Sequence, residues 1–210
     1  MVKGEASLSL SMESKNNKIY IFSAPSGAGK TTIVRAVKQH FDHMGFSVSA
    51  TTRSPRVNEQ DGVDYYFLSQ KEFQDKIEAD AFLEWEEVYQ GLFYGTLKSE
   101  VDRIRSGGQH VLFDVDVQGG INIKKYYGEE AISFFIQPPS VEVLRQRLES
   151  RGTNSEEDIQ RRCDKAAYEM QFAPEFDHVI LNDVLETAIA EVFAIIENSA
   201  SHSRIVESQD

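Results

Sequence analysis

Cysteine is nearly absent from this sequence, and the absence narrows the kind of protein that it can be. Cys163 is the one cysteine among 210 residues, so no disulfide can form within the chain, and the reducing cytoplasm is the expected location. Cys163 stands in an apparently helical stretch without a histidine near it in sequence. We therefore interpret it as a structural thiol rather than a catalytic one.

Positive charge and long apolar runs are scarce as well. The 22 lysines and arginines against 34 aspartates and glutamates give a formal net charge of −12, which repels a nucleic-acid backbone and confines any anion site to a local basic cluster. No apolar run approaches the ~18 residues of a membrane span. Residues 1–17 lack a continuous apolar segment, so we expect a disordered tail, native or appended, rather than a signal peptide. These features predict no nucleic-acid partner and no membrane partner.

The rest of the chain alternates short apolar runs with segments of helical spacing. β-branched and aromatic runs predict parallel strands at 19–23, 110–116, 132–136 and 178–182, with a weaker candidate at 46–50. Section 51–97 differs, because its aromatic runs are closely spaced and the capping box "SQKE" at 69–72 predicts one helix. We predict an α/β fold, in which helices cover both faces of a parallel sheet and a small antiparallel or mixed lobe is inserted.

A loop of small residues joins the first strand to the first helix. "APSGAGKT", residues 24–31, fits the P-loop pattern G-x-x-x-x-G-K-[ST] except that Ala24 replaces the first glycine, a change that matters only if that position needs a positive φ. Backbone N–H groups of such a loop bind a polyphosphate. Lys30 would reach the β- and γ-phosphates, and the Thr31 hydroxyl would face Mg²⁺. A plain Gly-rich turn is the alternative, but strand, loop, lysine, hydroxyl and helix occur in the required order. The predicted ATP-binding residues are Ala24, Pro25, Ser26, Gly27, Ala28, Gly29, Lys30, Thr31 and Thr32.

Two arginines and one glutamate suggest the acceptor of the phosphoryl group. Arg53 and Arg56 flank Pro55 in an otherwise acidic chain, and their guanidinium groups suit a phosphate monoester, to which Tyr65 could add a hydroxyl donor. Two solvated arginines on a surface turn are the alternative. Glu84 lies among aromatic and aliphatic neighbours, and a carboxylate accepts two parallel hydrogen bonds, which guanine offers at N1–H and N2–H and adenine does not. A solvated strand carboxylate would look the same in the sequence.

Acidic and basic residues further along complete the motifs. Asp114 occupies a Walker-B-like position, where a carboxylate holds a Mg²⁺-bound water. Asp116, two residues on, would project to the same side of a strand, with ordinary strand-end carboxylates as the alternative. Arg147 and Arg151 share one helix face next to Gly152, a candidate hinge.

Together these motifs resemble the guanylate kinase family, over residues 18 to about 200. The matching stretches are "SAPSGAGKTT", "SATTRSPR", "DGVDYYF", "FLEW", "YGT", "FDVDVQGG", "PPSVEVLRQRLESRG" and "VILND". The resemblance implies transfer of the γ-phosphoryl group of MgATP to GMP or dGMP in purine nucleotide metabolism, with Mg²⁺ as the cofactor. It also implies one domain over 18–206, with a P-loop NTPase-type core (18–50, 98–140 and 163–206), a GMP-binding lobe (51–97) and a helical lid (141–162).

The resemblance further assigns roles residue by residue. The groups acting on the transferred phosphate would be Lys30, Arg147, Arg151 and Arg162. Thr31 and Asp114 would serve Mg²⁺. The GMP site would comprise Ser49, Arg53, Arg56, Tyr65, Glu84, Tyr94, Thr96 and Asp116, with Ser49 and Glu84 at the base. Thr96 stands where the family often has serine, and one extra residue separates Glu84 from Tyr94. No general base is required, because GMP already presents an anionic phosphate oxygen.

Two other functions use related sequences. Guanylate-kinase-like domains of scaffolding proteins bind peptides and typically have degraded nucleotide loops, whereas Lys30 and Thr31 are intact here. A P-loop phosphotransferase for another monophosphate is the second alternative, against which Ser49 and Glu84 argue. A panel of monophosphate substrates distinguishes these functions. The sequence alone does not distinguish a monomer from a homo-oligomer.

Overall fold

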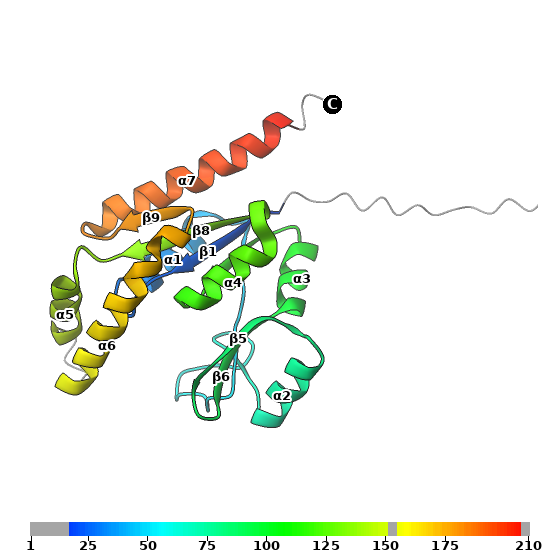
Figure 1. Ribbon diagram of the computed structural model, residues 1–210. Helices are drawn as coiled ribbons and strands as arrows, with labels where there is room; N and C mark the ends of the chain where they lie inside the picture. The colour runs from blue at the N-terminus through cyan, green and yellow to red at the C-terminus, as the bar shows by residue number, and fades with distance from the viewer. Residues whose placement is uncertain (1–16, 151–154, 207–210) are drawn as a thin grey trace, which may run out of the picture.

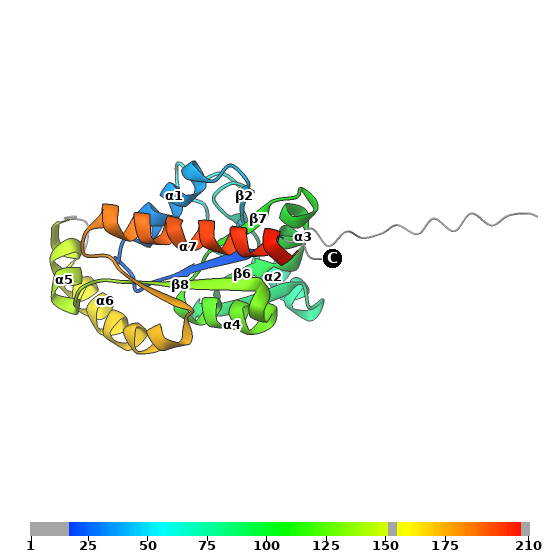
Figure 2. The same ribbon diagram turned by 90° about the horizontal axis from the view of Figure 1, so that it is seen from above.

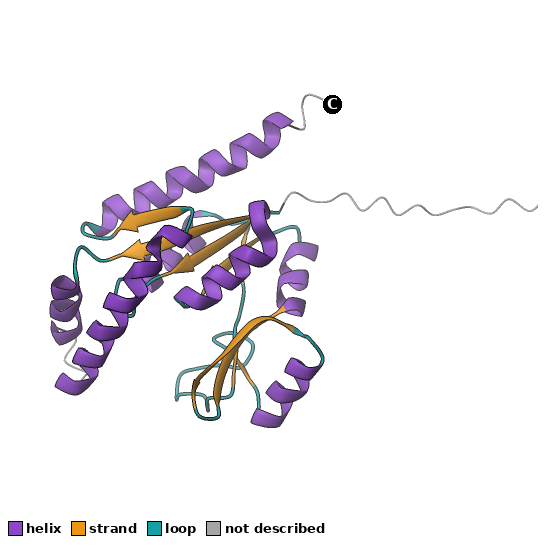
Figure 3. Cartoon of the chain, in the orientation of Figure 1, coloured by secondary structure: helices purple, strands orange, loops and turns teal. Residues whose placement is uncertain are grey.

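Two sheets and the helices around them make up the part of the chain that the computed structural model describes, residues 17–150 and 155–206 (Figures 1 and 3). The predicted tail, except for Asn17, lies outside these residues. Within them, no helix is both long enough and apolar enough to cross a bilayer.

The larger sheet has five parallel strands in the order β2-β7-β1-β8-β9. Its strands are β1 Ile19–Ser23, β2 Met44–Phe46, β7 His110–Asp114, β8 Ala131–Gln137 and β9 His178–Leu181. Four of them coincide with the four main predicted runs to within two residues at either end. The prediction of a parallel sheet is therefore confirmed.

Helices cover both faces of this sheet, as Figure 2 shows from above. Tyr20 and Phe22 of β1 pack in the cluster that includes residues of α1 and α7, whereas Ile19 and Ile21 pack with residues of α3 and α4. This alternation explains why β1 is apolar from Ile19 to Phe22: each successive side chain enters one of two cores. The helices are α1 Lys30–His40, α3 Lys98–Ser106, α4 Val117–Tyr127, α5 Val141–Ser150, α6 Glu156–Glu169 and α7 Leu185–Val206, with short 3₁₀ helices at Gly128–Glu130 and Met170–Glu175.

The smaller sheet has four strands in the order β4-β3-β6-β5 and hangs below the core with α2 (Figure 1). The elements are β3 Ala50–Thr51, β4 Tyr66–Phe67, α2 Gln70–Glu78, β5 Phe82–Tyr89 and β6 Leu92–Leu97. β3 pairs with β4 in parallel, and the other pairings are antiparallel, so the sheet is mixed. The predicted capping box is present, because Ser69 and Glu72 satisfy each other's backbone N–H groups at the start of α2.

One strand prediction is wrong, and another extends two residues too far. The candidate strand 46–50 is divided between the sheets: β2 ends at Phe46, β3 begins at Ala50, and the residues between them cross from core to lobe. The predicted strand 110–116 ends at Asp114. Asp116 is instead the N-cap of α4, where its Oδ1 accepts a hydrogen bond from the Gly119 N–H at 2.7 Å. The expected strand geometry between Asp114 and Asp116 therefore does not exist.

Helix α4 itself was not predicted from the sequence. Two consecutive glycines near its N-terminus disfavour helix intrinsically, and they obscure the helical pattern. Packing explains one of them: a Cβ atom on Gly120 would lie 2.3 Å from the Ser23 Oγ. The helix thus depends on close approach to β1, which no local propensity reveals.

Candidate active site

The P-loop connects β1 to α1 and is shaped by two glycines. Gly27 and Gly29 have φ values of +94° and +96°, a region that other residues rarely adopt. A Cβ atom on Gly29 would also lie 2.3 Å from Asn182 Nδ2. Ala24 is buried and is not among the described residues of positive φ, where Asp80 is the one non-glycine. The alanine therefore introduces no backbone strain at the first position of the motif.

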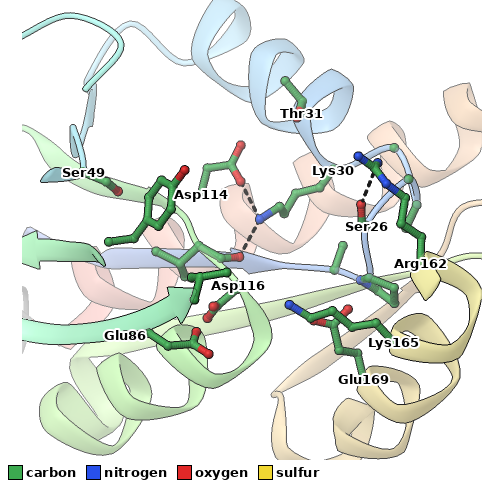
Figure 4. A pocket seen from close by; sticks show the side chains of 18 of the residues that line it. Ser26, Lys30, Thr31, Ser49, Glu86, Asp114, Asp116, Arg162, Lys165 and Glu169 are labelled. Atoms are coloured by element: carbon green, nitrogen blue, oxygen red, sulfur yellow. Dashed lines mark hydrogen bonds and ion pairs between the residues drawn. The ribbon is translucent and has the colours of Figure 1, made fainter. Parts of the chain in front are cut away.

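Lys30 lies at the start of α1 and is bound to the end of β7. Its Nζ lies 2.6 Å from Asp114 Oδ1 and donates to the Val115 carbonyl oxygen at 2.5 Å (Figure 4). This pairing was not predicted from the sequence. An incoming phosphate must therefore compete with the Asp114 carboxylate for the lysine, or draw the lysine away from it.

Oxygen donors suited to Mg²⁺ lie beside the P-loop. Thr31 and Asp114 both line the same cavity, and Mg²⁺ prefers oxygen ligands but takes most of them from phosphates and water. No group of three His, Cys, Asp or Glu side chains suited to a metal occurs in 17–150 or 155–206. The donor set therefore fits a metal that arrives with a nucleotide rather than one held by a dedicated protein site.

A cavity of about 730 Å³ extends from the P-loop to the smaller sheet. Its lining joins segments that are far apart in sequence: Ala24–Thr32, Phe46, Ser49, Tyr65, Glu84, Glu86, Val88, Tyr94, Gly95, Asp114–Asp116, Arg162, Lys165 and Glu169. The predicted ATP-binding loop and five predicted GMP-site residues thus share one space.

Glu84 lines this cavity from β5. Its Oε1 accepts a hydrogen bond from the Thr96 hydroxyl at 2.6 Å, and Thr96 is buried. Burial raises the pKa of Glu84 to about 7, the Asp116 carboxylate adds to the increase, and the Thr96 hydrogen bond opposes it. The carboxyl group is consequently poised between its neutral and ionised forms near neutral pH.

The guanidinium groups of Arg53 and Arg56 are not brought into the cavity lining. Arg53 forms two hydrogen bonds to Glu59, at 2.9 and 2.8 Å, and lies 5.4 Å from the ring centroid of Tyr65, which does line the cavity. The buried Arg53 Nε has no hydrogen-bond partner. Arg56 is exposed. The pairing of Arg53 with Glu59 was not predicted from the sequence, although an acidic residue three positions after Arg56 could have indicated a partner for these arginines.

Two of the three arginines predicted for the lid lie among the described residues, and their environments differ. Arg162 of α6 faces the P-loop, where its Nη1 donates to Ser26 Oγ at 3.3 Å (Figure 4). Arg147 of α5 donates to the Asn182 carbonyl oxygen at 2.8 Å and does not line the cavity. Arg151 lies outside the described residues. Cys163, next to Arg162, is a buried free thiol whose pKa is raised by burial, as expected of a structural cysteine.

Comparisons with known proteins agree with this geometry. The sequence profile of the family described as Guanylate kinase matches residues 16–199. The chain belongs to the guanylate kinase family. It is 55% identical over 180 residues to a guanylate kinase of Bacteroides fragilis, covering 86% of this chain and 88% of that protein. It is 39% identical over 193 residues to one of Thermotoga maritima, covering 92% and 91%. The crystal structure of guanylate kinase from Anaplasma phagocytophilum matches with a TM-score of 0.66 at 28% identity, covering 87% of this chain and 86% of that one.

Family membership confirms the resemblance stated from the sequence, and with it the P-loop α/β fold. It does not account for three charged residues of the cavity that no sequence motif singled out: Glu86, Lys165 and Glu169. Glu86 follows Glu84 by two residues on the same face of β5, and Lys165 and Glu169 follow Arg162 at helical spacing. Strand and helix periodicity could therefore have identified all three once Glu84 and Arg162 were chosen.

Glu86 lies against Asp116. The hydrogen bond that the two carboxyl groups share, together with partial burial and their mutual repulsion, raises the pKa of Glu86 to about 7. Glu169 is buried on α6, burial raises its pKa, and its Oε2 has no hydrogen-bond partner. This side of the guanylate kinase cavity is therefore rich in carboxyl groups and poor in cations.

Proposed function

We propose that this chain transfers the γ-phosphoryl group of MgATP to GMP or dGMP, giving ADP and GDP or dGDP, in cytoplasmic purine nucleotide metabolism. Family membership supports the activity. The single observation that carries the assignment of residues is the cavity itself, because its lining combines a P-loop with a hydroxyl-bound glutamate of the smaller sheet.

At the donor end, the P-loop 24–32 would bind the ATP phosphates through backbone N–H groups at the start of α1. Lys30 would leave Asp114 and contact the β- and γ-phosphates. Its positive charge would then stabilise the negative charge of the phosphate oxygens during transfer. Thr31, and Asp114 through a water, would hold Mg²⁺, which would supply positive charge to the phosphate oxygens.

At the acceptor end, Ser49 and Glu84 would bind the guanine base. The ionised Glu84 would accept the N1–H and N2–H donors, and Thr96 would orient the carboxylate through the hydrogen bond already present. Asp116 would lie beside the same base. Tyr65, Tyr94, Arg53 and Arg56 would hold the phosphate.

In the transfer step, a phosphate oxygen of GMP forms the new bond to the γ-phosphorus, and the bond to the β,γ-bridging oxygen of ADP breaks. No residue needs to remove a proton, because the attacking oxygen is already ionised. Arg147, Arg151 and Arg162 would balance charge on the transferring group. In this assignment the core is 18–50, 98–140 and 163–206, the GMP lobe is 51–97 and the lid is 141–162.

A coupled assay of ADP release tests the proposal, with GMP, dGMP, AMP, CMP and UMP as acceptors. We expect turnover with GMP and dGMP and at most trace turnover with the others, because adenine and the pyrimidines lack the paired donors of guanine. Equal turnover with AMP would contradict the assignment of Glu84. Absence of turnover with every acceptor would contradict the kinase activity itself.

A further inference from the structure

Three cationic side chains from the described parts of the chain line the cavity: Lys30, Arg162 and Lys165. Lys30 is bound firmly to the end of β7, and Arg162 donates to the P-loop. Lys165 has a looser contact, because its Nζ lies 3.5 Å from Oε1 of Glu169 on its own helix, and its side chain is 55% exposed. In Figure 4 it extends from α6 into the cavity, toward the side on which Asp116 and Glu86 lie.

Glu86 faces Lys165 from the smaller sheet. It lies against the carboxyl of Asp116, and this contact disfavours ionisation of Glu86. The positive charge of Lys165 acts on Glu86 in the opposite sense and favours its ionised form. A glutamate without an ion pair to any described residue and a lysine with a loose partner thus lie on opposite walls of one cavity.

We propose that Lys165 and Glu86 form an ion pair when the smaller sheet closes onto the core over a bound acceptor nucleotide, so that both are positioning residues for phosphoryl transfer. This inference rests on the proposed function. The pair would connect β5, which carries Glu84, to α6, which carries Arg162 one turn before Lys165. Formation of the ion pair would fix the position of β5, which binds the base, relative to α6, which carries Arg162.

The ion pair gains strength as the site closes. In an open cavity, a pair with exposed side chains contributes little, because water screens both charges. Closure around a nucleotide removes that water and strengthens each remaining charge interaction. The pair therefore stabilises the closed complex more than the open one, which is the property of a positioning contact.

Charge reversal provides the test, with kcat/KM for GMP measured at saturating ATP. Lys165→Glu places a fourth carboxyl group beside Glu86, Asp116 and Glu169, so we expect a loss of at least about tenfold, and Glu86→Lys should also lose activity. The double variant restores opposite charges in exchanged positions. Its kcat/KM should recover to within about threefold of the wild-type value. If the two substitutions acted independently, their losses in kcat/KM would multiply instead.

The matched control uses Glu87, the neighbour of Glu86 on the opposite face of β5, whose Oε1 accepts from the Gly91 N–H at 2.7 Å. Glu87→Lys combined with Lys165→Glu should not recover activity. Affinity for a non-hydrolysable ATP analogue alone should be unchanged in all variants, because no acceptor is present to close the site. Thermal unfolding verifies that each variant folds. If a charge-reversal variant does not fold, a double-mutant cycle of Lys165→Gln and Glu86→Gln replaces it.

Recovery in the exchanged double variant, or non-additivity in the glutamine cycle, supports the ion pair. A double variant no better than its worse single variant overturns it, as does a normal kcat/KM in Lys165→Glu. A raised KM for GMP on changing Lys165, with no effect of changing Glu86, would show that Lys165 contacts the nucleotide instead and also overturns the pair. These results require an active wild type, so inactivity of the wild type toward GMP refutes the proposed function separately.

Discussion

Glu84→Gln should separate base recognition from stability, because the two effects of this substitution have opposite signs. The amide has the shape of the carboxylate, and its carbonyl oxygen can keep the Thr96 hydroxyl bond that Glu84 Oε1 accepts at 2.6 Å. Its NH₂ group then faces the N–H donors of guanine. Losing the acceptor for these donors costs about 2–3 kcal/mol, which is about 30- to 150-fold in the KM for GMP.

IMP provides the discriminating substrate. It lacks the N2 amine, so the substitution removes one charge-assisted hydrogen bond from IMP but two from GMP, and the loss with IMP should be smaller. Because the base contact exists before transfer, kcat should change less than KM. Steady-state ADP release with both acceptors measures this, and Glu87→Gln on the opposite face of β5 is the control. Equal losses with GMP and IMP would refute the reasoning.

Stability should change in the opposite direction. The pKa of Glu84 is raised from 4.5 to about 7, so its contribution to stability is fully present below pH 4.5 and is lost as the pH rises through about 7. This pKa difference corresponds to at most about 3–4 kcal/mol. Glu84→Gln should therefore raise Tm by several degrees at pH 8 and leave it unchanged at pH 4.5. A Tm shift that is independent of pH would show that the carboxyl is not strained by burial.

The remaining predictions concern pH, the donor site, the two nucleotide sites and motion. Affinity for GMP should rise between pH 6 and 8 more steeply in wild type than in Glu84→Gln, because guanine binds the ionised carboxylate. Calorimetry at each pH measures this affinity, and an equal pH dependence in both proteins would contradict the prediction. Lys30→Ala should remain folded yet lose at least ~100-fold in kcat, and near-normal turnover would refute the P-loop assignment. Arg56→Ala should mainly raise the KM for GMP and Arg162→Ala mainly lower kcat, so exchanged phenotypes would show that the assignments to lobe and lid are wrong. An ATP analogue and GMP together should reduce the radius of gyration in small-angle scattering more than either ligand alone. Equal radii for the ligand-free protein, each single complex and the double complex would contradict closure.

Local chemistry made much of this protein predictable from its sequence. The P-loop needs glycines of positive φ, a lysine and a hydroxyl in consecutive positions, and all of these lie within nine residues. The runs of β1 and β8 are apolar because both faces of these strands are covered, so parallel strands could be predicted with nearly correct ends. The run of β9 is apolar as well, although Val179 and Leu181 at the edge of the sheet are exposed. The capping box of α2 is likewise a contact between neighbours, Ser69 and Glu72.

Tertiary structure decided what sequence neighbours could not. Helix α4 contains Gly119 and Gly120 because other groups lie where their side chains would be: Glu84 and Asp116 beside Gly119, and β1 and Phe176 beside Gly120. Asp116 leaves the strand because the helix needs its carboxylate as a cap.

The electrostatics of the site also arise from distant segments. Lys30 and Asp114 are 84 positions apart in sequence, yet their charged atoms lie 2.6 Å apart. Packing of β5 against the start of α4 brings together the carboxyl groups of Glu84, Glu86 and Asp116. Lys165 of α6 lines the same cavity. The sequence by itself thus determined the chemical groups and the family, because each motif is short. The tertiary structure decided which charges face one another, since a pKa or an ion pair depends on distance in space rather than along the chain.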